Sequence, residues 1–254
     1  MIKAVIFDMY ETLVSKYSQP RQNDDLIMYN MYETLVSGHT QTPYLGKHIC
    51  IDSGIPEDKF YGIWHTTEDD RTTGKLSLEE VIERILKENG KYTDELFNMI
   101  IHKRKTAETA YFEHLHPEII PMLRSIRNKG VKTGLVTNCF FEERDAIIKS
   151  PLYTYFDAVC MSCELGLMKP DKEIFLICTE KLAVRPEECL YVGDGGSKEL
   201  ETAASLGMNP LRAVWYLQEH TQQPSGINDS FPEIKTPMEI PEHCVQDTEV
   251  PINN

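Results

Sequence analysis

Short apolar runs alternate with amphipathic helical patterns along most of the chain. The apolar runs stand at residues 2–7, 131–136, 156–161, 189–192 and 212–217. Helical patterns occupy residues 117–129, 142–149, 171–182 and 197–206. Strands that alternate with helices are typical of a parallel sheet covered by helices on both faces. The pattern therefore predicts an α/β fold, and a weaker run at 231–234 is compatible with a short edge strand.

Polar residues stand where these predicted strands end. Asp8 ends the first run, Thr137 and Asn138 follow the second, and Asp194 comes shortly after 189–192. In open parallel sheets, ligands bind in the crevice at the carboxyl ends of the strands. We therefore expect these side chains to lie near one another and to form the reactive site.

Residues 16–115 follow a different pattern, in which the apolar positions recur at helical spacing. Helices are expected at residues 56–68, 77–89 and 93–115. Ser77 with Glu80 three residues later forms a capping box at the start of one of them. The sequence therefore predicts a helical cap at 16–115, inserted into a core made of residues 1–15 and 116–254.

One segment of the chain is repeated. Residues 9–15 recur without change as residues 31–37, but Asp8 precedes the first copy and Asn30 the second. An amide is a poor nucleophile and a poor metal ligand. We predict that the first copy enters the sheet and that the second copy, near residues 27–37, is a non-catalytic insertion in the cap; the reverse threading remains an alternative.

The charge balance narrows the choice of partners. The 254 residues include 40 Asp and Glu against 26 Lys and Arg, which gives a net charge of −14. Such a chain repels nucleic-acid phosphates and anionic lipid, so neither nucleic acid nor a membrane is an expected partner. A small anionic substrate would need a local cation or a metal ion, and the oligomeric state is left open.

The sequence shows no targeting signal or membrane-spanning segment. The apolar run at the N-terminus is too short for a signal peptide, and no run approaches the roughly 20 apolar residues of a membrane span. The seven cysteines are therefore interpreted as reduced thiols of a cytoplasmic protein. Cys160 and Cys163 are interpreted as buried structural thiols, with redox or metal chemistry as the alternative.

The residues at the strand ends suggest metal-assisted chemistry. Two carboxylates, Asp8 and Asp194, would repel each other at one site unless a proton or a cation intervened. Mg²⁺ accepts one or two carboxylates together with a carbonyl, waters and substrate oxygens. Lys169, which follows the run at 156–161, can balance a nucleophile and an incoming anion. This set suits covalent catalysis by an aspartate on an anionic substrate.

At these positions the chain resembles the haloacid dehalogenase (HAD) superfamily. Residues 7–13 look like its first motif, Thr137-Asn138 like its second, Lys169-Pro170 like its third and residues 193–199 like its fourth. The resemblance spans roughly residues 1–217. It implies a Rossmann-like core with a movable cap, and a hydrolase whose aspartate attacks the substrate.

The resemblance also implies roles for individual residues. Asp8 would form an aspartyl intermediate that water then hydrolyses. Thr137 and Lys169 would hold phosphoryl oxygens or orient the nucleophile, and Asn138 would bind the substrate. The family's metal positions correspond here to Asp8, the main-chain carbonyl of Tyr10, and Asp194. Glu199 would be an outer acidic residue that pairs with Lys169.

Two residues depart from the family pattern. Family phosphatases have a second aspartate at the position of Tyr10, where it protonates the leaving group, and tyrosine is a poor base at neutral pH. Family dehalogenases of small 2-haloacids carry tyrosine there and use no metal, but they lack the Gly193-Asp194 pair. Glu11 replaces a usual glycine and is either a solvated turn residue or a substitute for the missing acid.

Three hypotheses follow. The first is a magnesium-dependent phosphatase of a small phosphorylated metabolite, slow or selective for good leaving groups because of Tyr10. The second is a metal-free 2-haloacid dehalogenase, and the third is a catalytically weakened binding or regulatory protein. In the cap, Arg71 is expected on a turn, where it is either solvated or reaches down to an anionic substrate.

Overall fold

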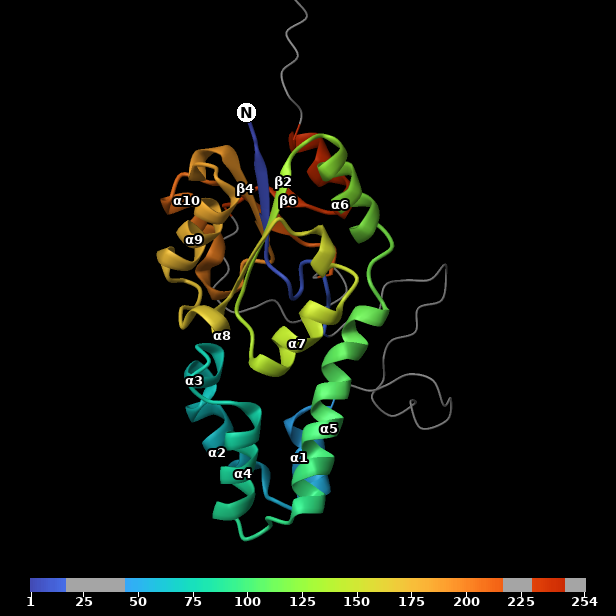
Figure 1. Cartoon of the computed structure of the whole chain (residues 1–254), viewed down its shortest axis with the longest axis vertical. Coiled ribbons are helices and arrows are strands. Elements are labelled where there is room, and N and C mark those ends of the chain that lie inside the picture. The colour runs from blue at the N-terminus through green and yellow to red at the C-terminus, as the bar shows by residue number, and fades with distance from the viewer. Residues whose placement is uncertain (17–43, 217–229, 245–254) are drawn as a thin grey trace, which may run out of the picture.

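The computed structural model describes residues 1–16, 44–216 and 230–244. Within these residues six strands form one parallel sheet in the order β3-β2-β1-β4-β5-β6 (Figure 1). The strands are β1 Ala4–Phe7, β2 Lys132–Thr137, β3 Ala158–Met161, β4 Cys189–Gly193, β5 Asn209–Ala213 and β6 Glu233–Ile234. Strand order reverses between β1 and β4, so their carboxyl ends border the crevice where such sheets bind ligands. The predicted α/β class is confirmed.

Helices cover both faces of the sheet and thereby bury β1 on both sides. Val5 and Phe7 pack with α6 Ile119–Asn128 and α7 Phe141–Lys149. Ala4 and Ile6 pack on the opposite face with α9 Lys172–Leu182 and α10 Glu199–Ser205. Figure 1 shows α9 and α10 on one side of the strands and α6 on the other. An uninterrupted apolar strand of this kind is typical of a central position in a parallel sheet.

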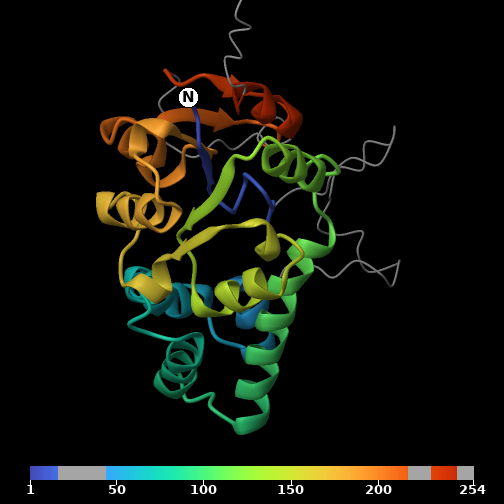
Figure 2. The same ribbon diagram turned by 45° about the horizontal axis from the view of Figure 1, so that its top comes forward.

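The inserted region is helical and has a core of its own. It contains α1 Gly46–Ser53, α2 Glu57–Thr66, α3 Glu68–Thr72, α4 Leu78–Glu88 and α5 Asp94–Ala110. The capping box of Ser77 and Glu80 is present at the start of α4. The apolar stripe of α4 packs against α1, α2 and α5. Figure 2 shows this group of helices at the end of the molecule opposite the N-terminus.

Among the described residues, the cap contacts the core through α5 and through the segment around α3. Helix α5 packs along α7 of the core. The loop after α3 meets α8, Ser162–Leu165, so closely that a Cβ on Gly74 would lie 2.0 Å from the carbonyl oxygen of Cys163. The carboxyl edge of the sheet therefore faces the cap. The proposed division at residues 15/16 and 115/116 stays a prediction.

Several expected boundaries were wrong. The strand expected at 212–217 is displaced: β5 starts at Asn209 and ends at Ala213, and residue 217 lies outside the described residues. The side chains of Trp215 and Tyr216 beyond it donate hydrogen bonds to the carbonyl oxygens of Thr12 and Leu13, so this run is apolar because it packs on the loop after β1. The helix expected at 93–115 stops at Ala110, and α1 was not predicted.

Short 3-10 helices complete the described secondary structure. They are Tyr111–Glu113, Tyr153–Tyr155, Pro186–Glu188, Gly196–Lys198 and Pro237–Cys244. None of the helices in the described residues is long and apolar enough to cross a membrane. All seven cysteines are buried free thiols, and they include Cys160 and Cys163, for which the sequence predicted burial.

The first copy of the repeated segment follows β1 in the middle of the sheet, as predicted. The second copy, at residues 31–37, lies outside the described residues, so its placement in the cap stays a prediction.

Candidate active site

Lys169 bridges two carboxylates at the carboxyl edge of the sheet. Its Nζ lies 2.5 Å from Oδ1 of Asp8 and 2.5 Å from Oε2 of Glu199. All three side chains are buried. Burial lowers the pKa of Lys169, but the two carboxylates outweigh this effect and raise it, so the lysine remains charged. The nucleophile candidate is thus fixed by a permanent cation.

Asp194 completes a group of three acids at this edge. Ligand oxygens of Asp8, Asp194 and Glu199 lie within 4.8 Å of one another. Burial, together with the charge of Asp8, raises the pKa of Asp194. Two buried carboxylates that disfavour each other's charge are stabilised by a divalent cation. The donor set of Asp8 and Asp194 therefore fits a hard metal ion such as Mg²⁺.

Glu199 has a different role because its carboxylate is already engaged. It accepts hydrogen bonds from the Tyr191 hydroxyl at 3.0 Å and from the Gly195 amide at 3.2 Å, in addition to the Lys169 contact. Burial, partly offset by Lys169, raises the pKa of Glu199 to about 8. A Cβ on Gly193 would lie 1.9 Å from Glu199 Oε1, so only glycine leaves room for this carboxylate. Its contact with Nζ helps to position Lys169 beside Asp8.

The second motif supports Lys169 through its backbone. The Asn138 side chain accepts a hydrogen bond from the Lys169 amide at 2.7 Å and donates one to the Lys169 carbonyl at 3.1 Å. Thr137 is buried at the end of β2, and its hydroxyl contacts the Asn138 carbonyl at 3.4 Å. Asn138 therefore holds the main chain of Lys169, whereas the sequence suggested substrate contact alone.

Tyr10 and Glu11 occupy the turn after the nucleophile. The Tyr10 hydroxyl is buried and has no hydrogen-bond partner within the described residues. Burial and the charges of Glu143 and Glu108 raise the pKa of Tyr10 well above its usual value, so it cannot serve as a base. Glu11 has a φ of 56°, the left-handed region that glycine adopts most easily. It accepts hydrogen bonds from Ser15 Oγ and the Lys16 amide, both at 2.8 Å, so it is not a solvated turn residue.

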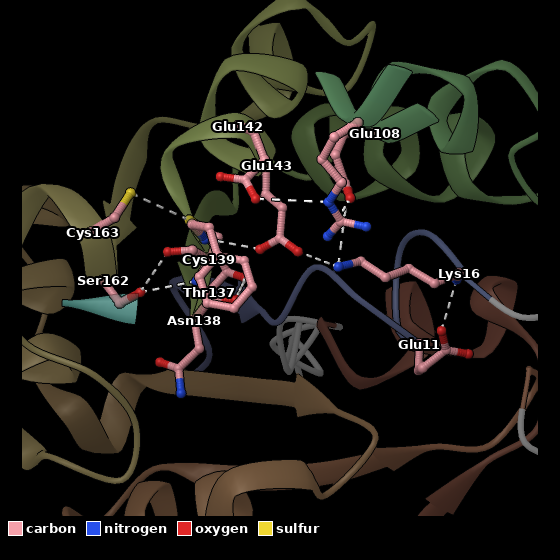
Figure 3. Close-up of polar contacts among 12 residues, drawn as sticks. Glu11, Lys16, Glu108, Thr137, Asn138, Cys139, Glu142, Glu143, Ser162 and Cys163 are labelled. Carbon is pink, nitrogen blue, oxygen red and sulfur yellow. Dashed lines mark hydrogen bonds and ion pairs between the residues drawn. The ribbon is translucent and has the colours of Figure 1, made fainter. Parts of the chain in front are cut away.

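A buried ionic cluster joins this turn to both helices at the cap–core boundary (Figure 3). Lys16 Nζ bonds to Glu143 Oε1 of α7 and lies 4.0 Å from Glu108 of α5. Arg104 of α5 pairs with Glu108 at 2.8 Å and approaches Glu142 of α7 at 3.8 Å. The cluster contains two cations and three carboxylates. Burial raises the pKa of Glu142 to about 7, and the charges of Glu143 and Glu108 act in the same direction.

A cavity of about 380 Å³ opens between α3 of the cap and the strand ends of the core. Its core side includes Lys16, Asn138 and Lys169, and its cap side includes Glu68, Asp69 and Thr72 of α3. The volume suits a small molecule. The cavity places the cap directly above the groups that adjoin Asp8.

Arg71 does not stand on a turn, as the sequence suggested, but in α3, where it is buried. Its guanidinium lies between the rings of Trp64 and Phe140, at 3.8 and 4.2 Å from their centroids. Burial lowers its pKa to about 10, and its Nε and NH1 atoms have no hydrogen-bond partner within the described residues. Phe140 lines the cavity, whereas Arg71 is not among its lining residues.

Sequence reasoning missed three residues of this site. Tyr191 lies in the middle of β4 and was taken for core, and nothing in its pattern marks it as a partner of Glu199. Lys16 and Glu143 come from segments that meet only in the fold. Glu143 does carry a local signal, since it caps α7 by accepting a hydrogen bond from the Phe140 amide at 2.9 Å.

Comparison with known proteins gives a consistent family. A family model described as haloacid dehalogenase-like hydrolase matches residues 2–207. The glyceraldehyde 3-phosphate phosphatase of Methanopyrus kandleri is 30% identical over 233 residues, which cover 84% of each protein. The phosphoserine phosphatase of Thermus thermophilus is 32% identical over 117 residues, which cover 44% of this chain and 46% of that protein.

Solved structures share the whole fold at lower identity. A HAD phosphatase from Thermococcus onnurineus has a TM-score of 0.57 at 23% identity and covers 96% of this chain and 98% of its own. A 2-haloacid dehalogenase from Pseudomonas syringae pv. Tomato DC3000 has a TM-score of 0.60 at 20% identity, and the match covers 95% of this chain and 97% of the dehalogenase. One fold thus carries both chemistries, and the residues of the site must distinguish them.

Proposed function

The chain belongs to the haloacid dehalogenase-like hydrolases, and we propose that it is a magnesium-dependent phosphatase that hydrolyses small phosphorylated metabolites in the cytoplasm. The similarity to the Methanopyrus kandleri phosphatase over most of both chains supports phosphatase chemistry. The observation that carries the proposal is the meeting of Asp8, Asp194 and Lys169 at one buried edge. Metal-free halide release needs neither the second carboxylate nor the acidic cluster.

In the proposed reaction Asp8 is the nucleophile. Its carboxylate oxygen bonds to phosphorus while the bond from phosphorus to the leaving oxygen breaks, and water then hydrolyses the aspartyl phosphate. Lys169 orients Asp8 and balances the charge of the phosphoryl group. Mg²⁺, held by Asp8, Asp194 and the Tyr10 carbonyl, would supply charge neutralisation for the phosphoryl oxygens.

The remaining predicted residues act around this centre. We assign Asn138 to the orientation of Lys169, because both ends of its amide already bind the Lys169 main chain. Thr137 is assigned to the phosphoryl oxygens, and Glu199 to the positioning of Lys169. Arg71 retains a proposed role in binding an anionic substrate, for which its guanidinium would have to leave its place over the Phe140 ring.

Tyr10 favours a second candidate, the metal-free 2-haloacid dehalogenase, because halide leaves without a proton. Tyr10 also motivates the third candidate, a catalytically weakened binding or regulatory protein, because it replaces the proton donor of the family phosphatases. In the phosphatase, its consequence is a preference for leaving groups that depart as stable anions.

Hydrolysis of p-nitrophenyl phosphate by the purified protein, with and without Mg²⁺, tests the proposal. We expect turnover that needs Mg²⁺ and that disappears in Asp8→Asn. Chloride release from chloroacetate in the presence of a chelator, with no phosphate release, would favour the dehalogenase. Absence of both activities across a broad phosphate panel would favour the binding protein.

A further inference from the structure

We infer that Lys16 is a second catalytic cation of this site, whose ammonium group stabilises the leaving oxygen of the phosphate ester in place of the acid that Tyr10 replaces. The inference rests on the proposed phosphatase function. It addresses a gap in that function, since Tyr10 stands two positions after the nucleophile in place of the family's proton-donating aspartate, and its buried hydroxyl has no hydrogen-bond partner within the described residues.

Lys16 stands where such a cation is needed. It lines the same cavity as Lys169 and Asn138. Its Nζ lies over the ring of Tyr10, 3.9 Å from the centroid, so the ammonium occupies the space beside the residue that stands in the acid's position. Figure 3 shows its side chain extending from the turn after β1 toward Glu143 and Glu108.

The contacts of Lys16 fix it without using all of its donors. Glu143 binds it through Oε1, and its other oxygen accepts the Phe140 amide. Glu108 lies 4.0 Å away, beyond hydrogen-bond distance. An ammonium has three N–H donors, so at least one is left for an oxygen in the cavity. The Glu143 carboxylate bonded to the ammonium favours its charged form.

Departure of the leaving oxygen, the step that this cation assists, needs no proton from a side-chain acid. As Asp8 bonds to phosphorus, the electron pair of the breaking P–O bond goes to the leaving oxygen, beside Lys16. A phenolate departs as the anion, and an alkoxide takes a proton from water. The hydroxide left by that water is equivalent to the one consumed when the aspartyl phosphate is hydrolysed, so ester plus water gives alcohol plus phosphate. Donors placed against a developing oxyanion typically contribute about 10²–10³-fold to the rate.

The test compares Lys16→Met, Lys16→Arg and wild type on phenyl phosphate and p-nitrophenyl phosphate with saturating Mg²⁺. Phenolate is the poorer leaving group and needs more help. We expect Lys16→Met to lower kcat/KM for phenyl phosphate about tenfold more than for p-nitrophenyl phosphate. Lys16→Arg keeps the charge, so its ratio of kcat/KM for phenyl phosphate to kcat/KM for p-nitrophenyl phosphate should lie close to that of wild type. Lys105→Met removes a surface lysine that pairs with Glu79 at 2.6 Å, and should leave the ratio unchanged.

The ratio of the two rates does not depend on how much of the variant is folded, so a partly unfolded Lys16→Met still gives a decisive result. An unchanged ratio in Lys16→Met, whatever the loss in rate, would overturn the inference and leave the phosphatase proposal standing. A wild-type protein inactive on both esters would instead overturn the proposed function, and the inference with it.

Discussion

Lys169 Nζ lies 2.5 Å from Oδ1 of Asp8, although 161 positions separate the two residues. Asp8 follows β1, whereas Lys169 lies in the loop between α8 and α9. The contact forms because the Asn138 side chain holds the backbone of Lys169 and the Glu199 carboxylate holds its Nζ. A lysine restrained at both ends can orient the nucleophile without a search of rotamers, which favours a preorganised site.

Replacement of Asp8 by asparagine should abolish phosphatase activity. The amide cannot form the aspartyl phosphate, and it leaves Lys169 with one carboxylate fewer. We expect kcat to fall by about 10³-fold or more, measured by phosphate release from p-nitrophenyl phosphate. Asp52→Asn is the matched control, because Asp52 pairs with Lys103 and Tyr44 within the cap. Activity of Asp8→Asn within tenfold of wild type would contradict the nucleophile assignment.

Mg²⁺ should stabilise the wild-type protein through Asp194. A ligand that binds only the folded state at 100 times its Kd adds about 2.7 kcal/mol to the free energy of unfolding. We expect Mg²⁺ to raise the Tm of wild type and to change the Tm of Asp194→Asn little. Thermal unfolding with and without Mg²⁺ measures both values. Asp69→Asn, at the cap side of the cavity, serves as control and should retain the response. Equal shifts in wild type and Asp194→Asn would place the metal elsewhere.

Alanine at position 193 should displace Glu199. A Cβ there would meet Glu199 Oε1 at 1.9 Å, so the carboxylate must leave Lys169 and Tyr191. We expect Gly193→Ala to lose roughly 1–3 kcal/mol of unfolding free energy and most of its activity, measured by urea denaturation and phosphate release.

Gly62→Ala in α2 is its control, since a Cβ there meets no atom within 4 Å. It should gain roughly 0.5–1 kcal/mol, because alanine is the better helix former. The double variant Gly193→Ala/Glu199→Ala should recover part of the stability. Were the two changes strictly additive, the clash would not be the cause.

Glu142 should make stability depend on pH. Burial raises the pKa of this carboxyl from 4.5 to about 7 in the folded protein. The folded state therefore holds a proton that the unfolded state has already lost, so the free energy of unfolding falls as pH rises from about 4.5 to about 7 and is level above. Glu142→Gln keeps a neutral side chain and should be increasingly stabilised relative to wild type across this window.

Chemical denaturation at pH 5, 6, 7 and 8 checks this expectation. Glu83→Gln is the matched control, because Glu83 is an exposed partner of Lys87 and its variant should differ from wild type by a nearly constant amount. A constant difference for Glu142→Gln as well would show that Glu142 is ionised throughout in the folded protein.

The sequence predicted the catalytic edge but not the partners of its residues. Asp8, Thr137 and Asp194 were found because each follows an apolar run at once or after a single residue, and the ends of parallel strands share one edge. Arg71 was misplaced because α3 is a single short helical turn with no apolar periodicity of its own. The end of β5 was misjudged because buried strand and buried loop share the same composition, as Trp215 illustrates.

Local patterns along the chain determined the α/β class, the inserted helices and the order of the chemical groups, because periodicity and motif spacing depend on neighbours in sequence. Only the tertiary structure decided that Lys16 stands over Tyr10, that Glu143 holds it from α7, and that Gly193 makes room for Glu199. These contacts depend on how α5, α7 and α10 pack on the sheet. The angles and offsets of such packing arise from many side chains together, and no single segment encodes them.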